Sequence, residues 1–159
     1  MPRVLLTLGD SWPEGAELGN GLRYGELLRD SMNYDEFYNY GSGGASNEDM
    51  LYQLQRYIAT HHSADNSVTA VFFLTNPART AHLPRFASLD ATSDERRHWP
   101  PDAKQFMRDF FLHFHTPAHE IMRSTATVTA LQTWCNRHHI DDYYFSGWVK
   151  YPTWLPGVD

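Results

Sequence analysis

Ser11 is the first residue whose type and position could support catalysis. It follows an apolar run at residues 4–8 and the pair Gly9-Asp10, so its hydroxyl group is expected on the turn that leaves a buried strand. In an open α/β sheet, ligands and chemistry lie at the carboxyl ends of the strands. The same residue types also suit an ordinary strand-to-helix turn. This segment alone therefore leaves both interpretations open.

The glycine-rich segment at residues 41–46 (GSGGAS) is the second candidate. Three glycines in four residues predict unusual backbone dihedral angles or a close approach by another group. Ser46 and Asp49 form a capping-box pattern, so the loop leads into a helix whose free N–H groups suit an anion or a developing oxyanion. A tight connection without function explains the glycines as well. The spacing of a dinucleotide-binding loop is absent.

Asn76 is the third candidate. It follows the apolar run at residues 68–74 and precedes Pro77, which ends the strand. An asparagine that merely forms a turn also explains this position. The alternation of strands and helices nevertheless predicts that three strand ends, marked by Ser11, Gly44 and Asn76, lie along one edge of a sheet.

Strand-like and helix-like segments alternate along the chain, and this alternation predicts an α/β fold. We expect a flavodoxin-like three-layer α/β/α sandwich with a mostly parallel sheet of four to five strands. Strands are expected near residues 4–8, 36–40, 68–74 and 142–147, and helices near 22–32, 46–60, 102–114 and 116–139. The apolar residues expected to share helix faces are Leu22, Leu27, Leu28 and Met32; Met50, Leu51, Leu54, Tyr57 and Ile58; and Ile121, Val128, Leu131, Trp134 and Cys135.

Length and composition indicate one domain over residues 1–159. A net charge of −6 without a basic run argues against a nucleic-acid partner or a basic membrane patch. A single cysteine, with no visible signal peptide or membrane span, predicts a cytoplasmic protein. The nine histidines lack metal-ligand spacing, so neither a metal nor a cofactor is expected. The long connection at residues 78–101 is interpreted as a lid, a substrate-contacting insertion or an ordinary loop.

Taken together, the three segments resemble the sequence blocks of the SGNH (GDSL-type) hydrolase family of esterases, lipases and acetylesterases. Gly9-Asp10-Ser11, followed by Gly15, is similar to the first block. Residues 39–46 are similar to the second, and residues 74–77 fall where the third is expected. The resemblance covers about the first half of the chain, and the third block lacks its usual glycine and aspartate.

This resemblance implies a role for each candidate. Ser11 would be the nucleophile, and the oxyanion hole would comprise the N–H groups of Ser11 and Gly44 and the side-chain amide of Asn76. The family's last block, Asp-x-x-His, is missing from the sequence. Either the chain is a shortened form of a longer product, or its base comes from elsewhere. His138 and His139 are the histidines nearest in sequence to the expected position of that block.

Two functions follow as expectations. The first is a serine ester hydrolase of the SGNH type that acts on a small-molecule or carbohydrate ester. The second is a non-catalytic SGNH-like module that binds a glycan or another protein and has lost its catalytic base. The oligomeric state is left open.

Overall fold

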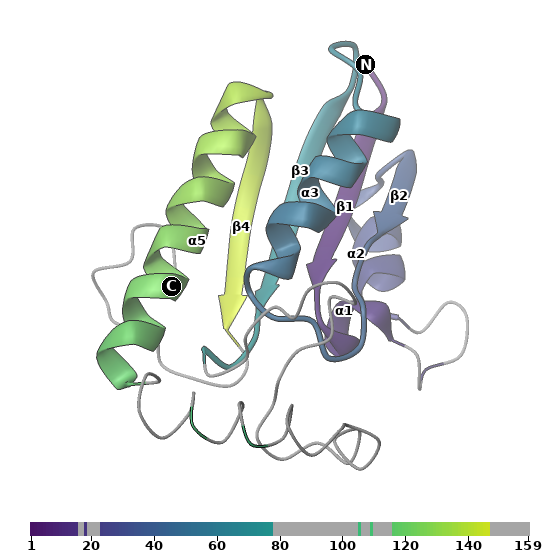
Figure 1. Cartoon of the computed structure of the whole chain (residues 1–159). Coiled ribbons are helices and arrows are strands. Elements are labelled where there is room, and N and C mark those ends of the chain that lie inside the picture. The colour runs from purple at the N-terminus through teal and green to yellow at the C-terminus, as the bar shows by residue number, and fades with distance from the viewer. Residues whose placement is uncertain (16–17, 19–22, 78–104, 106–108, 110–115, 147–159) are drawn as a thin grey trace.

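A computed structural model describes residues 1–15, 18, 23–77, 105, 109 and 116–146 of the chain (Figure 1). Its four strands form a single parallel sheet in the order β2-β1-β3-β4. The strand bounds are Arg3–Gly9 for β1, Glu36–Asn39 for β2, Ser67–Leu74 for β3 and Ile140–Ser146 for β4. The predicted parallel α/β fold is therefore confirmed.

The central strand β1 is buried from Val4 to Gly9. Continuous burial is typical of a parallel strand that is covered on both faces, and this explains the uninterrupted apolar run in the sequence. The fourth strand begins at Ile140, two residues earlier than predicted. Its first residues, including the polar Asp141 and Asp142, pair with the start of β3. This long-range pairing extends the strand through residues whose local pattern does not indicate it.

Helices α3 (Asp49–Thr60) and α5 (Pro117–Arg137) cover one face of the sheet (Figure 1). Thr116 caps α5 by accepting a hydrogen bond from the His119 N–H, and Pro117 occupies the first turn, as the sequence predicts. Alternate strand residues pack against the two helices. The buried core on this face contains Val4, Leu6, Leu8, Met50, Leu54, Tyr57, Val68, Ala70, Phe72, Leu74, Val128, Leu131, Cys135, Ile140 and Tyr144.

Helix α2 (Tyr24–Met32) lies on the opposite face, which completes the three layers. Its buried residue is Gly25, which lies against the ring of Phe37 and the side chain of Thr7. The expected apolar face of this helix is only partly found: Leu28 is half-buried, but Leu27 and Met32 are 52% and 49% exposed. Leu22 lies outside the described residues.

The expected inward face of α5 is partly confirmed. Val128, Leu131 and Cys135 are buried, but Ile121 is 38% exposed. A helix of 21 residues is about 31 Å long, whereas the seven residues of β4 span about 23 Å. The first turns of α5 therefore extend past the strand, and Ile121 lies on that part.

Some predictions concern residues outside the described part of the chain. The connection at residues 78–101 lies there, as does the helix expected at 102–114 apart from residues 105 and 109. None of the helices in the described part is both long and apolar enough to cross a bilayer.

Candidate functional site

Ser11 lies where the sequence predicts, directly after the end of β1. Asp10 is the N-cap residue of the short helix α1 (Ser11–Glu14), and Ser11 is the first residue of that helix. The side chain of Ser11 is exposed. Its hydroxyl forms no hydrogen bond within the described part of the chain. The serine is thus placed at the carboxyl edge of the sheet, accessible to a ligand.

Asp10 is only 2% exposed and fixes the segment that carries Ser11. Its Oδ1 accepts a hydrogen bond from the Trp12 N–H at 3.0 Å, and its Oδ2 accepts one from the Thr75 hydroxyl at 2.9 Å. The first bond caps α1. The second crosses from β1 to the residue after β3. Both carboxylate oxygens thus bind other groups of the protein, and Asp10 positions the turn that carries Ser11.

Asn47 continues this network on the other side of Thr75. The Thr75 N–H donates to Asn47 Oδ1 at 2.8 Å, and Asn47 Nδ2 donates to the Thr75 carbonyl oxygen at 3.3 Å. Asn47 is 3% exposed and Thr75 is 1% exposed. Hydrogen bonds to both backbone groups hold the chain immediately before Asn76, whose side chain is exposed.

The glycine-rich loop closes on the same strand end. The Ser42 N–H donates to the Gly9 carbonyl oxygen at 3.1 Å, and the Ala45 N–H donates to the Ser42 carbonyl oxygen at 3.0 Å. Residues 42–45 thus form a β-turn. Gly44 occupies its third position with φ of 78°, the value of a type II turn, which favours glycine. This confirms the unusual backbone geometry that the sequence predicts.

Gly41 allows the loop to approach α1. A Cβ atom on Gly41 would lie 2.5 Å from the backbone nitrogen of Glu14, so a larger residue would push the loop away from the helix that carries Ser11. The Gly44 N–H has no acceptor among the described residues and is not used by the turn. It is therefore available as a hydrogen-bond donor at this edge of the sheet.

The side chain of Gln53, from helix α3, binds the backbone at the end of β1. Its Oε1 accepts from the Gly9 N–H at 2.9 Å, and its Nε2 donates to the Gly9 carbonyl oxygen at 3.0 Å. With a 6% exposed side chain, Gln53 satisfies two backbone groups at a point where the ladder between β1 and β2 has ended.

The hydrogen bonds of the predicted capping box between Ser46 and Asp49 are present, but the N-cap residue of α3 is Glu48, whose side chain makes no cap bond. Asp49 Oδ2 accepts from the Ser46 N–H at 2.6 Å and from the Ser46 hydroxyl at 2.8 Å. The helix itself begins at Asp49, after a turn. Burial raises the pKa of the Asp49 carboxyl above its ordinary value, the Ser46 bonds oppose this rise, and the charge of Glu48 adds to it.

The structure thus holds the segments of Ser11, Gly44 and Asn76 through one buried polar network. Sequence analysis missed the positioning residues of that network, which are Asp10, Asn47, Gln53 and Thr75. Asp10 belongs to the Gly-Asp-Ser segment, but its type alone does not indicate a bond to Thr75. The other three match no motif that could have identified them.

The histidines nearest the missing block lie at the other edge of the sheet. His138 is the C-cap residue of α5, and His139 precedes the first residue of β4. That residue pairs with Val68 near the start of β3, whereas Gly9 pairs with Phe73 near its end. Five residues of strand, about 16 Å, separate the two levels. His138 and His139 are therefore not placed to accept a proton from Ser11.

The other described histidines lie at one or the other end of the parallel strands. His61 is the C-cap residue of α3, and the rings of His62 and His138 lie 5.4 Å apart. The first turn of α5, which contains His119, lies at the end of the sheet where α1 lies (Figure 1). His98 is outside the described residues. Within the described ranges, no three His, Cys, Asp or Glu side chains are grouped to hold a metal ion.

Comparisons with known proteins support the architecture. No protein-family model matches the sequence, and no curated protein does. Among solved structures, AlinE4, described as an SGNH-hydrolase family esterase, matches with a TM-score of 0.52 and 16% identity, covering 91% of this chain and 58% of that one. TesA matches with a TM-score of 0.50 and 13% identity, covering 89% and 58%. The chain therefore spans less than two thirds of either protein, and over that span it has the fold of an SGNH-hydrolase family esterase.

Proposed function

We propose that this chain is a serine ester hydrolase of the SGNH type and that Ser11 is its nucleophile. One observation carries the proposal: the segments of Ser11, Gly44 and Asn76 close on the end of β1. The Ser42 N–H binds Gly9, and the Thr75 hydroxyl binds Asp10. The likeness in fold to AlinE4 supports the same conclusion.

In the proposed reaction, Ser11 Oγ attacks the carbonyl carbon of an ester. The serine proton passes to a base, and the carbonyl oxygen becomes an oxyanion. The N–H groups of Ser11 and Gly44 and the amide of Asn76 donate to this oxyanion. The bond to the leaving alcohol then breaks, and water releases the acyl group from Ser11. In other hydrolases, losing one such donor costs about 2.7–4 kcal/mol of transition-state stabilisation.

The proposed substrate is a small-molecule or carbohydrate ester, and the proposed base is a group other than His138 or His139. Their place at the far edge of the sheet excludes direct contact with Ser11. It also favours a second candidate function, a non-catalytic module of the same fold that binds a glycan or a protein. Such a module would keep the arrangement of strand ends without an activated serine.

Labelling with a fluorophosphonate separates the two functions, because the probe reacts with activated serines. Intact-mass and peptide analysis of the purified chain should find the probe on Ser11. Ser11→Ala should remove it, whereas Ser42→Ala should not. Ser42 is the matched control, since it is an exposed serine at the same edge of the sheet. No labelling at Ser11, or labelling equal to that of Ser42, would contradict the hydrolase and favour the binding module.

A further inference from the structure

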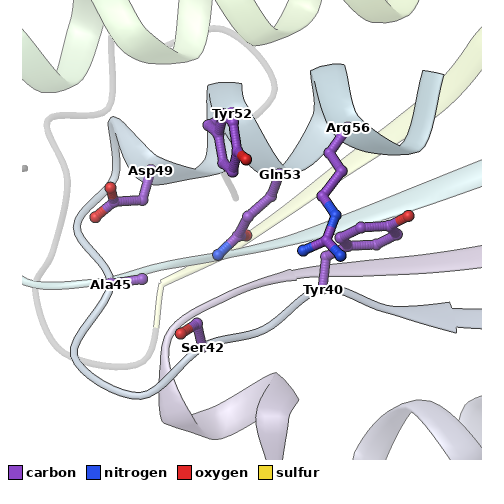
Figure 2. A pocket seen from close by; sticks show the side chains of 7 residues that line it. All are labelled: Tyr40, Ser42, Ala45, Asp49, Tyr52, Gln53 and Arg56. Carbon is purple, nitrogen blue, oxygen red and sulfur yellow. The ribbon is translucent and has the colours of Figure 1, made fainter. Parts of the chain in front are cut away.

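Two hollows in the described part of the chain differ in their chemistry. The first lies between the β2–α3 loop and helix α3 and contains both the Arg56 guanidinium and the Asp49 carboxyl group (Figure 2). It shares the glycine-rich loop with the proposed oxyanion hole and belongs to that site. The second, called the α5 hollow below, is shallow and apolar. Its lining residues are Ala118, Ile121, Met122, Thr125 and Ala126.

The α5 hollow faces away from helix α3. Arg123 of α5 forms an ion pair with Glu48, the N-cap residue of α3, so the Arg123 side of the helix is turned toward α3. Successive helix residues are about 100° apart, which puts Ile121 and Thr125 about 160° around the helix from Arg123. Helix α5 lies over the edge strand β4, with α3 on its inner side (Figure 1). The hollow therefore opens beside the outer edge of β4.

The outer edge of β4 is unpaired within the described part of the chain. β4 is the last strand in the sheet order, and its ladder joins it to β3 alone. No other backbone hydrogen bond between described residues involves residues 140–145. Natural edge strands are protected from pairing by lysine, by proline or by short length. β4 has seven residues, three of them aromatic, and contains neither lysine nor proline.

The face of β4 opposite α5 exposes aromatic side chains. Tyr144 belongs to the core beneath α5, so alternation directs Tyr143 and Phe145 to the other face, where they are 57% and 47% exposed. The Phe145 ring stacks on Phe73 of β3 with centroids 5.9 Å apart, and Tyr24 of α2 packs edge-on against Phe73 at 5.1 Å. A strand added to β4 would therefore find apolar surface on both faces.

The start of β4 adds negative charge to this edge. Asp141 and Asp142 are consecutive, and no residue of β4 is basic. Asp141 is exposed and forms no ion pair within the described part of the chain. A cation in an added strand would meet these carboxylates, whereas a second copy of β4 would bring two more carboxylates and no cation. Charge complementarity therefore favours a basic partner segment over self-association.

We infer that the outer edge of β4 binds an extended peptide segment that has a basic residue beside the two aspartates and apolar side chains farther along. Backbone hydrogen bonds to the edge supply affinity, and the alternating side chains supply specificity. On one face these side chains contact the α5 hollow, and on the other they contact Tyr143 and Phe145. The inference does not depend on catalysis by Ser11.

The probe is a peptide of the length of β4, blocked at both ends. It has lysine first, threonine at the next two positions, and alternating valine and isoleucine in the rest. The reversed sequence tests the opposite strand direction. In NMR titrations of the full chain, followed at the amides of residues 141–145, at least one peptide should bind saturably with Kd on the order of 0.1–1 mM.

Methylation of the peptide backbone tests whether the peptide adds as a strand. Alternate N–H groups of a strand point to opposite sides, so only one alternate set faces β4. Methylating that set should abolish binding, whereas methylating the other set should preserve it.

Variants at exposed positions test the two apolar surfaces and the charge. Tyr143→Ser and Met122→Ser should each weaken binding about fivefold or more, because each removes apolar contact surface. Met32→Ser, at an exposed methionine of α2, is the matched control and should not change it. Asp141→Lys should weaken the lysine peptide about threefold and tighten a peptide with glutamate in place of lysine. Asp65→Lys, at an exposed aspartate in the turn after α3, should alter neither.

Unchanged binding in both Tyr143→Ser and Met122→Ser would overturn the inference, as would unchanged binding of both methylated forms or no saturation by either peptide. Sedimentation of the chain alone tests a second copy as the occupant: a dimer that Tyr143→Ser dissociates would assign the edge to self-association instead. Cellopentaose that binds at residues 141–145 more tightly than the peptides would assign the surface to a glycan. Ser11→Ala should bind the peptides like the unmodified chain, which separates this site from the proposed hydrolase.

Discussion

The Thr75 hydroxyl donates a hydrogen bond of 2.9 Å to the Asp10 carboxylate, although the two residues are 65 positions apart in the sequence. Both side chains are at most 2% exposed. Each is followed by an exposed residue, Ser11 in one case and Asn76 in the other. This bond is therefore the structural link between the proposed nucleophile and one proposed oxyanion donor.

Thr75→Val should destabilise the chain by about 1.5–3 kcal/mol, because a buried carboxylate loses a hydrogen-bond donor while the side-chain shape is kept. Urea unfolding followed by circular dichroism measures the change. Thr133→Val is the matched control, since Thr133 is exposed and its hydroxyl only bonds back to Thr129; it should change the free energy of unfolding by less than about 0.5 kcal/mol. Equal effects of the two substitutions would mean that the Asp10 bond contributes nothing.

Gln53→Leu should cost about 1–3 kcal/mol of stability. It leaves the buried Gly9 N–H without its partner, whereas the Gly9 carbonyl oxygen keeps the hydrogen bond from the Ser42 N–H. Gln55→Leu, at an exposed position of the same helix, controls for the change in residue type. Thermal unfolding of both variants checks the prediction, and a Gln53→Leu protein as stable as the control would refute it.

Gly44→Ala should cost about 1–2 kcal/mol, since a side chain disfavours the positive φ of 78° at this position. Relaxation of the turn would also move the Gly44 N–H, so fluorophosphonate labelling of Ser11 should slow. Gly43→Ala is the natural comparison because Gly43 does not have a positive φ. Its Cβ would lie 3.0 Å from a carboxylate oxygen of Glu14, the mobile end of a side chain. A larger loss of stability in Gly43→Ala than in Gly44→Ala would contradict this explanation.

The buried Asp49 should make stability depend on acidity. Burial raises the pKa of this carboxyl above 3.8, so the folded chain binds a proton more readily than the unfolded chain. The resulting stabilisation is complete below the unfolded pKa and is lost as the pH rises through the folded one. Asp49→Asn lacks this titration. From about pH 4 to pH 7, urea titrations should therefore show the free energy of unfolding of the unmodified chain falling relative to that of the variant. A rise would reverse the predicted sign.

His138→Ala and His139→Ala should leave the rate of fluorophosphonate labelling at Ser11 within about twofold of the unmodified chain. Both histidines lie at the opposite edge of the sheet, roughly 16 Å away along the strands. Mass spectrometry over a time course measures the rate. Abolished labelling in either variant, with the fold retained by circular dichroism, would place that histidine in the mechanism after all.

The sequence alone determined the elements whose signals are local. The apolar runs of β1 and β3 identify buried parallel strands, and the spacing of Met50, Leu54 and Tyr57 identifies the buried face of α3. Thr116-Pro117 marks the start of α5. These signals are readable because periodicity, capping and backbone preference depend on neighbouring residues.

The tertiary structure decided everything that depends on contacts between distant segments. It left Leu27 exposed, and it left Ile121 exposed because α5 is longer than the strand β4 that it covers. It also joined Thr75 to Asp10 and Gln53 to Gly9. A hydrogen bond between residues 44 or 65 positions apart leaves no periodic trace in the sequence. Ser11 was therefore found from its motif, whereas the network that positions it required the fold.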